Sequence, residues 1–137
     1  MNNDLCKFES LPITILSSYG HNGLDWVHSL LDSHPEILLM PAFSFYRTLD
    51  FFKLKYGDAF ERYNDKQISI KLSSFLYRDE SYQVVRRKFL HTENEMLVFR
   101  ENLLFFMRKS SISSRVKKLF YGIHYSFCRV FDIEIDD

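Results

Sequence analysis

The residues best placed to do chemistry form a small polar loop between two apolar segments. They are Gly20, His21, Asn22, Gly23, Leu24 and Asp25. The two glycines let the backbone turn sharply and approach a ligand closely, and His21 carries a group that titrates near neutral pH. The first N–H groups of a helix that follows such a loop have no internal partner and can bind an anion. The same pattern also occurs in many strand–turn–helix units that bind nothing.

Two elements are predicted to position this loop. Before it, residues 13–16 form a short apolar run rich in β-branched side chains, which predicts a buried strand. After it, apolar side chains recur at helical spacing and predict an amphipathic helix that ends at Pro35. These side chains are Leu24, Val27, Leu30 and Leu31. The sequence therefore predicts an α/β fold that opens with a strand–loop–helix unit.

The run HSLLDSHPEI, at residues 28–37, resembles part of the sulfotransferase family, whose members transfer sulfuryl from PAPS (3′-phosphoadenylyl sulfate). In that family an apolar strand and an Arg-Ser-Gly-Thr-Thr loop precede a helix that ends in a Ser-Leu-Leu-Asp-Ser-His-Pro-Glu-like run. The resemblance implies a P-loop-like sulfotransferase fold with PAPS as its cofactor. It also implies that residues 20–25 hold the 5′-phosphosulfate.

The loop departs from the family pattern where the phosphosulfate would lie. The sequence His21-Asn22-Gly23-Leu24-Asp25 stands in place of Arg-Ser-Gly-Thr-Thr. Gly23 keeps the glycine, whereas His21 replaces a permanent cation. Leu24 and Asp25 remove two hydroxyl groups, and Asp25 adds a negative charge. No carboxylate base is present at residues 41–45, so no catalytic residue is identified. These departures predict weak or absent sulfuryl transfer by this chain.

Length and resemblance together set the expected domain organisation. At 137 residues the chain is one domain by its length. The resembling family continues well beyond this length and includes a later region that grips the 3′-phosphate of PAPS. We therefore expect residues 1–137 to form a single, helix-rich, truncated sulfotransferase-like domain that is incomplete at its C-terminus. Aromatic residues make up 17% of the chain, so exposed aromatic surface is expected to support a protein partner or self-association.

Composition narrows the classes of partner. The formal net charge is zero, so no global field attracts nucleic acid or an anionic membrane. No apolar run is long enough to span a bilayer, and residues 1–10 lack the pattern of a secretory signal. Cys6 and Cys128 fit no metal-site spacing and are interpreted as free thiols of a cytoplasmic protein, with a disulfide as the alternative.

Helical periodicity dominates the rest of the chain. It predicts helices at residues 43–56, 59–63, 68–77, 80–91, 92–107 and 115–131. Gly57 is a candidate C-cap for the first of these, and Thr92 with Glu95 forms a capping-box pattern. The basic cluster at residues 86–88 is interpreted as a solvated face, with a phosphate or acidic-partner patch as the alternative. His124 is expected to pack in the core rather than bind metal.

Three functions follow from these observations. The first is PAPS-dependent sulfuryl transfer to an unidentified hydroxyl or amine acceptor, with a nucleotide-type small molecule as the ligand and no metal. The second is a non-catalytic relative that acts as a binding or protein-interaction module. The third is an unrelated helical protein in which residues 20–25 are only a turn, and a structure without a sheet would favour it.

Overall fold

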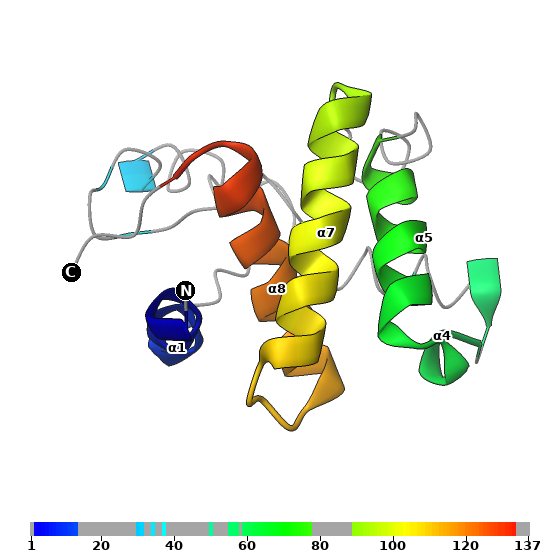
Figure 1. The fold of residues 1–137 in the computed structure, drawn as a ribbon, viewed down its shortest axis with the longest axis horizontal. Coiled ribbons are helices and arrows are strands. Elements are labelled where there is room, and N and C mark those ends of the chain that lie inside the picture. The colour runs from blue at the N-terminus through cyan, green and yellow to red at the C-terminus, as the bar shows by residue number, and fades with distance from the viewer. Residues whose placement is uncertain are drawn as a thin grey trace. The chain divides into compact units, whose positions relative to one another are not determined.

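The regular elements of the chain are helices, as seen in a computed structural model that describes residues 2–13, 30–31, 34, 37, 50, 55–57, 59–77 and 89–133. They are α1 (Asn2–Ser10), α4 (Ala59–Arg62), α5 (Asp65–Tyr77), α7 (Glu93–Lys109) and α8 (Arg115–Val130). The chain divides into two compact units. These five helices, which Figure 1 labels, belong to the unit formed by Met1–Ser10 and Ser44–Asp137. Residues 30–31, 50 and 55–56 are also helical among the described residues.

The predicted α/β fold is wrong, and with it the P-loop-like architecture, because no strand occurs among the described residues. Ile13, which begins the predicted strand, lies in irregular backbone and is 40% exposed. Leu30 and Leu31 are helical as predicted, but Leu30 is 58% exposed and does not build an apolar face. The physical reason for the error is that the described apolar side chains are buried where helices pack together, without a sheet.

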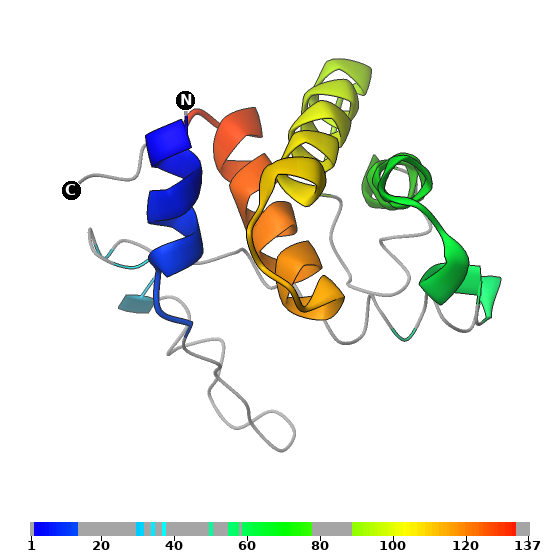
Figure 2. The same cartoon turned by 60° about the horizontal axis from the view of Figure 1, so that its bottom comes forward.

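Helix α7 lies between α5 and α8 and packs against both (Figures 1 and 2). It therefore buries side chains against both neighbours. Two apolar stripes in its sequence predicted burial on two faces: the stripe of Phe99, Leu103 and Phe106 is buried, but in the other stripe Leu97 is exposed and Leu104 is half-buried. Its buried residues are Phe99, Leu103, Phe106 and Met107. The predicted helices over α4, α5, α7 and α8 are confirmed, and Ser110–Ser114 form the short connection between the last two.

Helix α1 was not predicted, and it completes the core beside α8. The Phe8 ring meets those of Phe106, Tyr121 and Tyr125 edge to face, at centroid distances of 6.2, 6.2 and 5.5 Å. The carboxylate of Glu9 accepts hydrogen bonds from the Ser111 backbone N–H at 3.0 Å and hydroxyl at 2.7 Å. Partial burial acts to raise the pKa of Glu9, but hydrogen bonds from Ser110 and Ser111 outweigh it and lower that pKa.

Two predicted helix ends can be checked. Lys55 and Tyr56 are helical and Gly57 follows with φ of 59°, which confirms the glycine C-cap. The helix predicted to run through residue 91 is wrong at its end, because Phe89 and Leu90 are buried but not helical. The Leu90 N–H instead donates to the carbonyl of Leu76 at 3.4 Å. Residues 80–88, with the basic cluster, lie outside the described residues.

Thr92 caps α7 through the predicted reciprocal hydrogen bonds. Its Oγ1 accepts from the Glu95 N–H at 3.1 Å, and Glu95 Oε2 accepts from the N–H groups of Thr92 at 3.4 Å and His91 at 2.6 Å. We expect Thr92→Ala to lower the free energy of unfolding by about 1 kcal/mol, because the helix start loses a partner. Urea unfolding measures this loss, and Thr92→Ser should recover most of it. An unchanged midpoint in the alanine variant would contradict the role of the cap.

Candidate functional site

The predicted phosphosulfate loop, from Gly20 to Asp25, lies outside the described residues, as do the strand residues 14–16 and most of the helix that follows. The structure therefore brings none of these side chains to a described site. Binding of PAPS by this loop stays a prediction. The candidate sites among the described residues lie in the helical unit.

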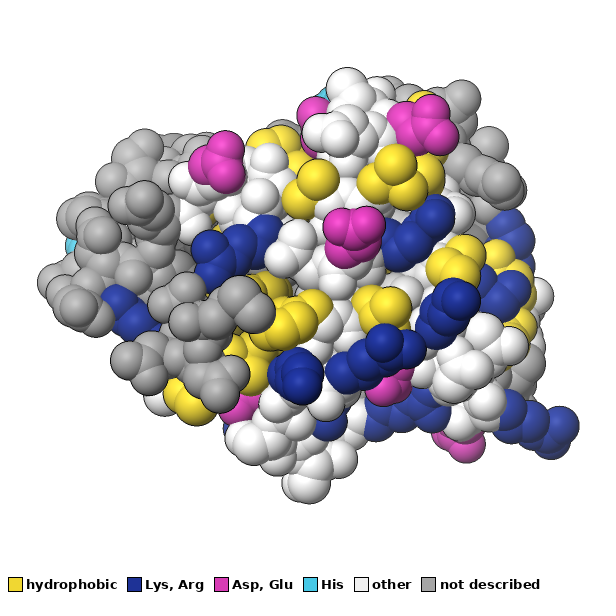
Figure 3. All heavy atoms as spheres, viewed as in Figure 1, with side chains coloured by type: hydrophobic (Ala, Val, Ile, Leu, Met, Phe, Trp, Pro, Cys, Tyr) yellow, Lys and Arg dark blue, Asp and Glu magenta, His cyan; other side chains and the backbone are white. Residues whose placement is uncertain are grey.

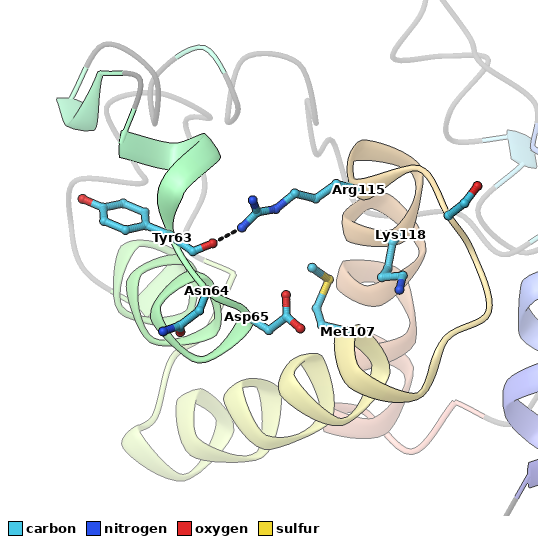
Figure 4. A pocket seen from close by; sticks show the side chains of 7 residues that line it. Tyr63, Asn64, Asp65, Met107, Arg115 and Lys118 are labelled. Carbon is cyan, nitrogen blue, oxygen red and sulfur yellow. Dashed lines mark hydrogen bonds between the residues drawn. The ribbon is translucent and has the colours of Figure 1, made fainter.

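One hollow of about 370 Å³ lies at the end of the helical unit where α5 begins, α7 ends and α8 begins (Figure 4). Its lining is Tyr63, Asn64, Asp65, Met107, Ser113, Arg115 and Lys118. The lining holds one carboxylate, two cations and no nucleophile beside a base. This set lacks the nucleophile–base pair that covalent catalysis requires.

Arg115 is occupied by the backbone. Its guanidinium donates to the carbonyl of Glu61 at 2.7 Å and to the carbonyl of Tyr63 (Figure 4). These two carbonyls lie at the end of α4 and just beyond it, so Arg115 joins the start of α8 to the start of α5. We interpret this side chain as structural, because both of its terminal nitrogens donate to backbone carbonyls.

His124 is packed as predicted. Its Nδ1 lies 2.7 Å from the carbonyl oxygen of Phe120, and its ring lies 4.2 Å from the Phe120 ring, centroid to centroid. A carbonyl oxygen can only accept, so Nδ1 carries the proton that it donates. Burial lowers the pKa of His124, with the Phe120 hydrogen bond opposing that change. Burial thus favours the neutral imidazole in the folded chain.

The lowered pKa of His124 predicts that stability falls as pH falls. Above the unfolded-state pKa of about 6.5 the imidazole is neutral in both states. As pH drops through that value, the unfolded chain takes up a proton that the folded chain does not, so unfolding is favoured. Urea unfolding between pH 8 and pH 5 measures the effect. His124→Gln, which keeps a donor and cannot titrate, should lose less stability over this range. Parallel profiles would contradict the prediction.

Two further kinds of site to consider among the described residues are metal-binding clusters and free thiols. Among the described residues no group of three or more His, Cys, Asp or Glu side chains is placed to hold a metal ion. Cys6 and Cys128 are free thiols, and burial raises the pKa of Cys128 to about 11, so its thiolate is scarce at neutral pH. No helix in the described part of the chain is long and apolar enough to cross a membrane.

The clearest surface feature is formed jointly by α5 and α7. Arg100 of α7 donates from Nε to Ser73 Oγ at 3.0 Å and from Nη2 to Ser74 Oγ at 3.4 Å, which sets the register of the two helices. They run in opposite directions (Figure 1). Side chains four residues apart lie one above the other on a helix. Leu104, four residues after Arg100, therefore lies beside Ile70, four residues before Ser74. In the same way Arg108 lies beside Lys66.

We call this surface the α5–α7 face. It consists of Lys66, Ile70 and Ser74 of α5 with Leu97, Arg100, Leu104 and Arg108 of α7. Ile70 is 39% exposed and Leu97 is 42% exposed, while Leu104 is half-buried. Figure 3 shows Lys and Arg side chains next to apolar side chains over these two helices. The face is thus apolar along part of its length and basic around it.

Two cations of this face form no ion pair within the described part of the chain. Lys66 and Arg108 are exposed, and the side chain of neither takes part in an ion pair or hydrogen bond there. The neighbouring Lys71 differs, because its Nζ lies 4.3 Å from the Tyr56 ring centroid and 4.9 Å from that of Tyr63. Exposed Glu101 is a carboxylate on the same side of α7, and it leaves the face net positive.

Comparison of the chain with models of protein families, with curated proteins and with solved structures finds no match. The resemblance to sulfotransferases thus depends on the short run at residues 28–37 and on the loop before it. Evidence for a function of the helical unit comes from the geometry of its described residues.

Sequence reasoning did not single out the α5–α7 face. Its signal is present in the sequence, since Leu97, Leu104 and Arg108 recur at helical spacing, as do Lys66 and Ile70. The packing of α5 against α7 brings the two stripes together, and in it Arg100 contacts Ser74, which lies 26 residues away in the sequence. No local pattern reveals such a contact.

Proposed function

We propose that the helical unit is a non-catalytic protein-interaction module. The observation that carries this proposal is the exposure of Ile70 and Leu97 on neighbouring helices whose other apolar side chains are largely buried. Exposed aliphatic side chains cost free energy in water, and a partner that covers them recovers it. The core of the unit is already shielded from water, because Leu76, Phe99 and Leu103 are inaccessible to solvent. A partner would therefore cover the surface side chains and not the core.

The polar groups of the unit support the same proposal. Every buried side-chain nitrogen or oxygen among the described residues has a hydrogen-bond partner. Buried polar groups left without partners are a frequent mark of catalytic sites. Two described groups of a kind that reactions use, His124 and Cys128, have pKa values that burial shifts toward their neutral forms. The free thiols of Cys6 and Cys128 agree with a reducing compartment such as the cytoplasm.

Photo-crosslinking tests the proposal. A photoreactive amino acid replaces Leu97 or Ile70 in the full chain, which is expressed in its own cells and irradiated. Both positions should yield the same cross-linked protein, and excess unlabelled chain should suppress the product. Cys6 is the matched control position, because it is exposed on α1, and α1 lies beside α8 rather than beside α5 (Figure 1). Equal labelling from Cys6, or no labelling at either test position, would overturn the proposal.

Sulfuryl transfer is tested separately through the loop at residues 20–25. Calorimetric titration with PAP, the desulfated cofactor, is made at pH 6 and pH 8. If His21 holds a phosphate as a cation, PAP binds more tightly at pH 6. Binding of this kind would contradict a purely non-catalytic role, and Gly23→Pro should abolish it. No binding to a folded chain would agree with the interaction module.

A further inference from the structure

We infer that the α5–α7 face binds an acidic, amphipathic segment of a partner protein. This inference rests on the proposed function and adds the surface and the chemistry of the partner. The apolar members of the face are Ile70, Leu97 and Leu104, and they lie on helices whose register is fixed by Arg100. A partner must therefore present aliphatic or aromatic side chains along one stripe.

The positive charges of the face favour a partner that carries negative charges. Lys66 and Arg108 lie at one end of the apolar stripe, beyond the level of Ile70 and Leu104. Both are exposed, and within the described residues their side chains have no carboxylate or carbonyl partner. Basic residues also lie close to them in the sequence, Arg62 before α5 and Lys109 at the end of α7, and both are exposed. Carboxylates that flank the partner's apolar stripe would complement this end.

The shape of the site favours a helix over an extended chain. Two packed antiparallel helices present parallel rows of side chains, and an amphipathic helix can pack its apolar face against such rows. Addition of a strand requires an open sheet edge, and the described residues contain no strand. The partner segment is accordingly expected to gain helix when it binds.

A nucleic acid is a less suitable ligand for this face. Phosphate backbones bind surfaces that are basic along their length, whereas the exposed cations Lys66 and Arg108 lie at one end of this face and exposed Leu97 lies at the other. Stacking of bases would require exposed aromatic rings. The residues of the face are aliphatic, hydroxyl-bearing or basic, and none is aromatic.

The test uses the full chain and a fluorescent peptide of about 15 residues, with Leu or Phe at helical spacing and Glu elsewhere. Fluorescence anisotropy measures binding. Affinity should fall about tenfold in the double variant Lys66→Glu, Arg108→Glu, since two attractions become repulsions. Lys117→Glu is the matched control, because Lys117 is exposed on α8 and outside the face. It should change affinity by less than about twofold.

The peptide supplies controls that do not depend on the folding of protein variants. A peptide with Gln in place of Glu should bind more weakly, and one of the same composition with its apolar stripe scrambled should also bind more weakly. Raising the salt from about 0.05 to 0.5 M should weaken binding of the acidic peptide, because screening shortens the reach of its charges.

Several outcomes would overturn the inference. Equal binding of the Glu and Gln peptides would exclude acidic chemistry, and equal loss in Lys117→Glu would exclude this face. Tighter binding of a single-stranded oligonucleotide than of the peptide would assign the cations to a phosphate backbone. If the peptide fails while cross-links at Leu97 persist, the acidic partner is wrong and the interaction module stands. If the cross-links fail as well, both are wrong.

Discussion

Replacing Phe106 with alanine is expected to lower the free energy of unfolding by about 3–5 kcal/mol. Phe106 is inaccessible to solvent and lies where α7 meets both α1 and α8. Its ring lies 6.2 Å from that of Phe8 and 5.3 Å from that of Tyr125, centroid to centroid. Truncation removes these contacts and leaves a cavity that packed neighbours fill only in part. Because small domains are stable by about 5–15 kcal/mol, much of the stability is lost.

The adjacent residue provides a control for this prediction. Phe105 is half-buried, and its ring stacks on Tyr125 at 6.4 Å. Phe105→Ala removes a ring of the same size from the same helix, but water can enter the space it leaves. We expect it to cost clearly less than Phe106→Ala in urea unfolding followed by circular dichroism. Equal losses from the two variants would mean that α1 and α8 do not pack around Phe106 as described.

The sequence predicted the helices that carry strong local signals. Thr92 and Glu95 mark the start of α7, and the apolar stripe of Phe99, Leu103 and Phe106 along that helix is buried. The apolar residues of α8 recur at three- and four-residue steps; Leu119, Ile123 and Phe127 are buried, while Phe120 and Val130 are half-buried. Val116 is an exception, at 50% exposed, because it lies in the first turn of α8. Periodicity indicates which side of a helix is buried. It does not indicate how far along the helix that burial extends.

The fold class was wrong because a short apolar run has no unique secondary structure. Residues 13–16 suit an interior strand, but a strand needs neighbours, and the described chain has none. Helix α1 was missed for the opposite reason, since only Leu5 and Phe8 of its nine residues are buried apolar side chains. Two apolar side chains give little periodicity, and the contact of Phe8 with Tyr125 joins residues far apart in the sequence.

The predicted and the observed candidate sites differ in kind. The loop at residues 20–25 was chosen because glycine, histidine and a helix start suggest chemistry locally. The α5–α7 face has no local chemical signature, since lysine, arginine and leucine are ordinary on helix surfaces. This face can be recognised only in the structure, where Arg100 donates hydrogen bonds to Ser73 and Ser74. These bonds place the exposed apolar and basic residues of α5 beside those of α7. Surfaces made by register between helices are in general beyond the reach of local pattern.

Replacing Gly122 with leucine is expected to lower the free energy of unfolding by more than about 3 kcal/mol. Gly122 is buried in the middle of α8 at its contact with α7. A Cβ atom at this position would lie 2.9 Å from Leu103 Cδ1 and 3.2 Å from Phe106 Cδ1. Both neighbours are inaccessible to solvent and have no space into which to move. Leucine adds three more carbons beyond that Cβ, so α7 and α8 must separate.

Two further variants separate the steric effect at Gly122 from the helix preference of the new side chain. Gly122→Ala gains about 1 kcal/mol of helix propensity but adds the same short contacts, so we expect a net loss of about 1 kcal/mol. At Gly57 no atom lies within 4 Å of the place that a Cβ would take, and φ is 59°, so Gly57→Ala measures backbone strain alone, at about 1 kcal/mol. If Gly122→Ala raised the unfolding midpoint, Leu103 could yield, and the close approach of α7 and α8 would not be what requires glycine there.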